Sequence, residues 1–106
     1  MRVLLMADVG DHRLYKWTEF SGHVPLVGDR IAVRDLTDDL GSLPPFIVKD
    51  RLLWERHGFL EVIGSIAIPN GRLFKKAKTD DFKDFILNYL SSIGWVIGEP
   101  NRTEDK

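Results

Sequence analysis

The chain has 106 residues, of which 43% are hydrophobic and 29% charged, and its net charge at pH 7 is −1. This length and composition indicate one globular domain with a packed core rather than a disordered chain. Acidic and basic residues also balance within each half, which excludes a nucleic-acid footprint covering the whole domain. The absence of cysteine excludes disulfides, cysteine-bound metals and thiol catalysis.

The sequence shows no signal for a membrane. No apolar stretch approaches the ~20 residues that cross a bilayer. The run from Val3 to Ala7 is shorter than the apolar region of a secretory signal peptide. Together with the lack of cysteine, this leads us to expect a cytoplasmic protein with no membrane partner.

The first third of the chain reads as strands and turns. Residues 2–8 are apolar on both faces, which predicts a central strand. Gly10-Asp11-His12 is a turn signal, and the alternation over residues 13–20 predicts the second strand of a β-hairpin. Residues 25–29, Pro-Leu-Val-Gly-Asp, predict a tight turn that starts a third strand over residues 30–34.

A loop and a second hairpin follow. Residues 35–45 contain three aspartates, a glycine and two adjacent prolines, and they predict a loop long enough to carry function. Residues 46–56 predict a strand with a bend or bulge near Asp50. Residues 59–68 predict its partner, in which Gly64 indicates another bulge or a corner.

The long strand has an apolar pattern of its own. Its alternation places four apolar side chains on one face, with Asp50 as the interruption: Phe46, Val48, Leu52 and Trp54.

The last third contains the only expected helix. Residues 72–77 predict a short sixth strand after an Asn-Gly turn. Residues 80–93 carry apolar side chains at helical spacing, and Gly94 suits the residue after the helix end. Residues 95–97 predict a last strand or a segment that packs under the sheet.

These elements predict an α+β fold that is mainly β. Five or six antiparallel strands form a bent sheet or a small, partly open barrel, and the C-terminal amphipathic helix covers one side. The Pro25-x-x-Gly28-Asp29 turn resembles one found in SH3-like and other small barrels. We expect residues 1–98 to form a single compact domain and residues 99–106 a flexible polar tail.

The residues that could carry chemistry are few. His12, His23 and His57 each lie in or beside a predicted turn, and no two have the spacing of a local metal site. Ser21 lies close to His23, but no nucleophile elbow or phosphate-binding glycine loop accompanies them. We therefore assign no catalytic residue, no metal and no cofactor, and an enzyme is disfavoured.

A basic cluster is the sharpest local feature. With one aromatic residue among them, its members are Lys49, Arg51, Arg72, Phe74, Lys75, Lys76 and Lys78. On adjacent strands they would form a stripe that contacts a nucleic-acid backbone and stacks a base. The plainer interpretation, a solvated strand whose lysines protect a sheet edge, is favoured because neither half of the chain has excess positive charge.

The leading hypothesis is a small non-enzymatic binding or adaptor module that contacts another protein or a second copy of itself. All three tryptophans suit the core, but a barrel this small has room for about two of them. Trp95, near the helix end, is the candidate for an exposed one, which would mark a contact site. The proposed partner-binding residues are Asp35, Asp38, Asp39, Leu40 and Trp95. A nucleic-acid-binding barrel is the alternative, and a small-ligand-binding domain or enzyme is the second alternative.

Overall fold

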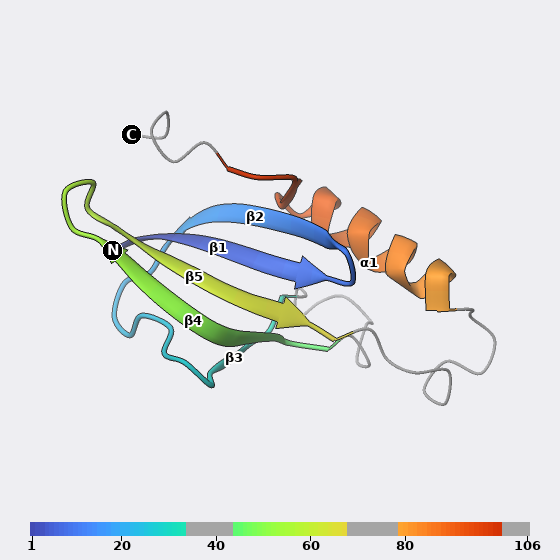
Figure 1. Ribbon diagram of the computed structural model, residues 1–106, viewed down its shortest axis with the longest axis horizontal. Coiled ribbons are helices and arrows are strands. Elements are labelled where there is room, and N and C mark those ends of the chain that lie inside the picture. The colour runs from blue at the N-terminus through green and yellow to red at the C-terminus, as the bar shows by residue number, and fades with distance from the viewer. Residues whose placement is uncertain (34–43, 68–78, 101–106) are drawn as a thin grey trace.

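The computed structural model describes residues 1–33, 44–67 and 79–100, with side chains described from residue 83 onward in the helix. These residues form β1 (Arg2–Val9), β2 (His12–Glu19), β3 (Arg30–Ile31), β4 (Phe46–Trp54), β5 (Phe59–Ile66), α1 (Thr79–Ser92) and β6 (Val96–Ile97). The strands build one sheet in the order β3-β4-β5-β1-β2-β6, curled into a half-barrel with α1 along one side (Figure 1). The predicted α+β, mainly β fold is confirmed.

The main core lies on the sheet face that α1 covers, which we call the inner face. From β1 it contains Val3, Leu5, Ala7 and Val9, and from α1 it contains Ile86, Leu87 and Leu90. The alternate β1 residues Leu4 and Met6 are also fully buried, on the opposite or outer face. Burial on both faces confirms that β1 is the central strand.

One strand pairing differs from the sequence-based expectation. The predicted sheet is antiparallel, whereas β1 pairs in parallel with β5, from Arg2 opposite Phe59 to Asp8 opposite Ser65. The other pairings are antiparallel, so the sheet is mixed. Apolar alternation is the same in both kinds of pairing, and only the path of the chain between β2 and β5 decides the direction.

A bulge changes the faces of β4. The register against β5 shifts between Val48 and Asp50, which leaves Lys49 without a partner in the ladder. Phe46 and Val48 pack in the inner core, but Trp54 packs on the outer face. The prediction that all four apolar residues of this strand share one face is therefore wrong, because an extra residue reverses the alternation beyond it.

Gly64 faces this bulge from the neighbouring strand. It pairs with Val48 on one side and with Ala7 on the other, and β5 itself continues without interruption. The predicted bulge near Asp50 is confirmed, whereas the bulge predicted at Gly64 lies in β4 instead.

The predicted turn at Pro25–Asp29 is confirmed. The Leu26 N–H donates to the Asp29 carboxylate at 2.9 Å, and Gly28 has a φ of 94° that favours glycine. The Gly28 N–H donates to the Val48 carbonyl and the Val48 N–H to the Asp29 carbonyl, both at 2.9 Å. These bonds attach the turn to β4 and place the short β3 at the sheet edge.

The end of α1 directs the chain back into the core. Gly94 has a φ of 103°, as predicted for the residue after a helix, and the Trp95 N–H donates to the Leu90 carbonyl at 3.0 Å. Trp95 then enters the inner core, and β6 pairs with β2. Both alternatives predicted for residues 95–97 are therefore realised.

Some expectations lie at or beyond the limits of the described residues. The predicted strand at 72–77, most of the 35–45 loop and residues 101–106 lie outside them. At the start of the predicted tail, Glu99 approaches Arg13 at 3.5 Å and Pro100 is buried.

An ion pair joins the β1–β2 turn to α1 and gives a pH-dependent prediction. Nζ of Lys83 donates to the Asp11 carboxylate at 3.2 Å, and this hydrogen bond lowers the pKa of Asp11. A lowered folded-state pKa means that the pair stabilises the fold above the unfolded-state pKa and loses this effect as pH falls through the folded-state pKa. We expect Lys83→Met to raise the Asp11 pKa in an NMR titration. Lys49→Met serves as the control, and an unchanged value in Lys83→Met would contradict the pairing.

Candidate binding surfaces

The predicted partner-binding residues are largely outside the described part of the chain. Asp35, Asp38, Asp39 and Leu40 all belong to the 34–43 gap. Trp95 is described, and only 4% of its surface is exposed. Its ring packs near Phe46, with the centroids 6.2 Å apart. Trp95 is therefore a core residue and not the exposed candidate, because the turn at Gly94 carries the indole into the core.

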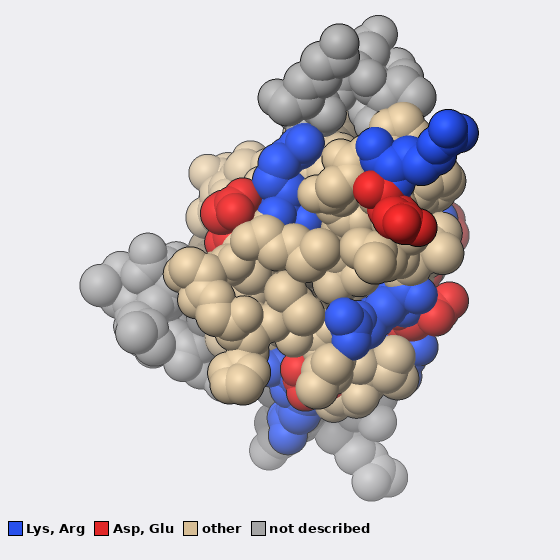
Figure 2. Space-filling model, turned by 90° about the vertical axis from the view of Figure 1, so that its left-hand side faces the viewer, with Lys and Arg blue, Asp and Glu red and all other residues tan. Residues whose placement is uncertain are grey.

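The predicted basic stripe is described at two positions. Arg72, Phe74, Lys75, Lys76 and Lys78 lie outside the described residues. Lys49 is exposed at the bulge, whereas Arg51 is half-buried and pairs with Val62. The alternation that would place Lys49 and Arg51 on one face does not hold across the bulge. The end of the molecule in Figure 2 shows Lys and Arg side chains separated by uncharged surface and mixed with Asp and Glu.

The histidines do not converge on a common site. His23 and His57 are exposed, and His12 is half-buried with Nε2 3.5 Å from the Asp11 carboxylate. Among the described residues, no group of three or more His, Asp or Glu side chains is arranged to hold a metal ion.

An aromatic cluster occupies the outer face of the sheet. Leu4, Met6 and Phe59 are buried at its base, and four half-buried side chains pack over them: Tyr15, Trp17, Trp54 and Ile63. The Trp17 ring meets Phe59 edge-on at 4.9 Å, and the Trp54 ring stacks on Phe59 at 6.0 Å. We call these seven residues the outer cluster.

Register places further residues beside the outer cluster. Four residues lie side by side across the sheet: Leu52 of β4, Glu61 of β5, Leu4 of β1 and Trp17 of β2. Leu52 is 49% exposed, whereas Glu61 is only 4% exposed. Nε1 of Trp54 is buried without a hydrogen-bond partner among the described residues. The outer cluster thus combines solvent-facing apolar surface with an unsatisfied donor.

Sequence reasoning missed the outer cluster. Trp17 and Trp54 were expected in the core, yet they are half-buried on the outer face, while Trp95 takes the core position. The available signal was the alternation in β2, which places Tyr15 and Trp17 on one face and Leu14 on the other. That pattern does not reveal which face the helix covers.

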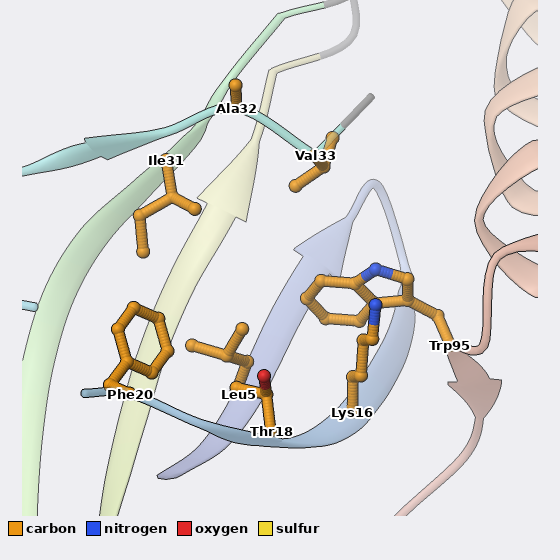
Figure 3. A pocket seen from close by; sticks show the side chains of 8 residues that line it. All are labelled: Leu5, Lys16, Thr18, Phe20, Ile31, Ala32, Val33 and Trp95. Atoms are coloured by element: carbon orange, nitrogen blue, oxygen red, sulfur yellow. The ribbon is translucent and has the colours of Figure 1, made fainter. Parts of the chain in front are cut away.

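A pocket opens on the inner face between β3 and β2 (Figure 3). It has a volume of about 170 Å³ and is lined by Leu5, Lys16, Thr18, Phe20, Ile31, Ala32, Val33 and Trp95. Among the described residues that line it, Lys16 is the one with a charge. Nζ of Lys16 donates to the Ile93 carbonyl at the end of α1, at 3.2 Å. The negative end of the helix dipole favours an ammonium group at this position.

The comparisons with known proteins name no relative. No family model matches the chain, and it has no match among the curated proteins or the solved structures. Within the described part of the chain, no helix has the length and apolar character needed to cross a membrane.

Proposed function

We propose that the chain is a non-enzymatic protein-binding module whose outer cluster docks on a second copy of the chain. One observation carries this proposal. Tyr15, Trp17 and Trp54 of the outer cluster are half-buried. Leu52 beside them is 49% exposed, on the face opposite the described helix. Contact surfaces are enriched in tryptophan and tyrosine packed around an apolar centre.

The charges around the outer cluster favour a second copy as the partner. Arg2 and Arg13 lie on this face together with Asp8 and Glu19. By register Asp50 and Glu61 lie on it too, so the face carries both signs of charge. Arg2 lies over the Trp17 ring at 4.7 Å, and Arg13 binds Asp8 at 2.8 Å. A two-fold axis brings each patch against its own copy, and a patch with both signs of charge can place its arginines against the carboxylates of the other copy. The net charge of −1 adds little repulsion.

Two adjacent leucines provide a matched test. Leu52 lies on the outer face opposite Glu61, and Leu53, which is 57% exposed, lies opposite the inner-core residue Leu60. Lysine at position 52 can remain solvated in the monomer, but dimer formation would bury its charge at a cost. We expect Leu52→Lys to raise the dimer dissociation constant at least about tenfold. Leu53→Lys should leave it unchanged, as measured by sedimentation equilibrium.

Three results would contradict this proposal. The wild-type chain could remain monomeric over the whole concentration range, or Leu53→Lys could weaken association as much as Leu52→Lys. The third is binding of a short single-stranded oligonucleotide, followed by tryptophan fluorescence, that weakens steeply between about 50 and 200 mM salt. That result would support the nucleic-acid alternative, with the half-buried Trp17 and Trp54 as stacking partners.

A further inference from the structure

We infer that the inner-face pocket binds a small carboxylate that carries a single apolar ring, separately from the protein contact proposed for the outer cluster. The volume of about 170 Å³ is close to that of cavities that hold one benzene molecule, about 150 Å³. Leu5, Ile31 and Val33 supply aliphatic walls, and Phe20 and Trp95 supply aromatic ones (Figure 3). A ring of this size can replace water against these side chains.

The polar groups of the pocket define the charge of the ligand. The Lys16 ammonium has three N–H donors, and within the described part of the chain it donates one hydrogen bond, to the Ile93 carbonyl. No carboxylate in the described part of the chain forms an ion pair with it, so a ligand anion would add a full negative charge to the partial charge that the end of α1 already places beside the ammonium. The Thr18 hydroxyl also lies at the pocket wall and can donate to the same anion (Figure 3). Apolar surroundings strengthen the attraction between the two charges.

The same features exclude larger and more highly charged ligands. A nucleotide would not fit a volume of about 170 Å³. One lysine matches a single negative charge, and a cation would be repelled by it. A monocarboxylate with one ring satisfies the volume, the apolar walls and the charge together.

The test uses benzoate as the probe and benzamide as its neutral counterpart. Binding of each to the intact chain is followed by ¹H–¹⁵N NMR shifts. We expect saturable benzoate binding with a dissociation constant of about 1–10 mM, and shifts at Lys16, Thr18, Phe20 and Trp95. Benzamide should bind at least about tenfold more weakly, because it lacks the charge that pairs with Lys16. The same NMR spectra report whether each variant is folded.

Matched variants distinguish the contribution of the Lys16 charge to benzoate binding from that of the cavity. Lys16→Met should weaken benzoate binding at least about tenfold and abolish the preference over benzamide, while Lys16→Arg retains it. Val33→Trp should fill the half-buried rim and weaken both probes, which keeps the inference testable if Lys16→Met does not fold. Two control variants should change the affinity for neither probe: Lys49→Met, which lies outside the pocket, and Leu52→Lys, which lies on the outer face.

The inference is overturned by any of three results. The first is that the wild type shows no saturable benzoate binding. The second is that Lys16→Met binds benzoate as tightly as the wild type does. The third is that benzoate causes NMR shifts only in the outer cluster. Because Leu52 and Lys16 lie on opposite faces of the sheet, failure of the dimer test leaves the pocket test intact, and the reverse also holds.

Discussion

Replacing Trp95 with alanine should lower the free energy of unfolding by about 3–5 kcal/mol, the usual cost of truncating a buried tryptophan. The side chain is 4% exposed and packs near Phe46 within the inner core. Its removal would leave a cavity in the space that Trp95 fills between the sheet and the end of α1. A domain of this size has a total stability of about 5–15 kcal/mol, so the variant should be marginally folded.

Urea denaturation followed by far-ultraviolet circular dichroism measures this effect. Val96→Ala is the matched control, because Val96 is the next residue and is 47% exposed. We expect this control to change stability by less than about 0.5 kcal/mol, as is usual for surface substitutions. The free energy of unfolding of Trp95→Phe should lie between those of Trp95→Ala and Val96→Ala. If Trp95→Ala were as stable as Val96→Ala, the indole would lie at the surface and the contact role first expected for it would regain support.

Gly64→Ala should be the most damaging glycine substitution in the sheet, with a cost of about 3 kcal/mol. A Cβ at this position would lie 2.7 Å from Cζ of Phe46 and would collide with the Ile47 carbonyl oxygen. The phenyl ring can shift, but the carbonyl belongs to the β4 backbone next to the bulge and is held by the ladder. The collision with this carbonyl can be removed only if β4 and β5 move apart, which weakens the hydrogen bonds between them.

Gly58→Ala is the control for this prediction. Gly58 has a φ of 71°, and a Cβ there would meet nothing within 4 Å. Its substitution costs only the left-handed backbone conformation, about 1 kcal/mol. Thermal unfolding should therefore rank wild type, Gly58→Ala and Gly64→Ala in decreasing order of stability. The reverse order would mean that β4 and β5 do not approach as closely as the structure describes.

Local features of the sequence predicted most of the secondary structure. The alternation of β2, the helical spacing of residues 80–93 and the turn at Pro25–Asp29 all correspond to observed elements. These signals depend on periods of two and 3.6 residues and on the backbone preferences of glycine and proline. They act over a few residues, so they can be read without knowledge of the rest of the chain.

The candidate surfaces could not be predicted in the same way. Side-chain type does not distinguish the three tryptophans, Trp17, Trp54 and Trp95. Their burial depends on which face of the sheet the helix covers, and no local pattern indicates that face. The single extra residue at Lys49 sends Phe46 inward and Trp54 outward. The pocket collects Lys16 of β2, Val33 after β3 and Trp95 after α1, three positions that only folding brings together.

The sequence by itself determined the order of strands, turns and one helix along the chain, because apolar periodicity and turn residues specify local conformation. The tertiary structure decided the parallel pairing of β1 with β5, which tryptophan is in the inner core, and the position of the outer cluster and the pocket on opposite faces of the sheet. The physical reason is that these features depend on contacts between residues distant in the chain. Such contacts form where the sheet curls and α1 closes on its inner face (Figure 1).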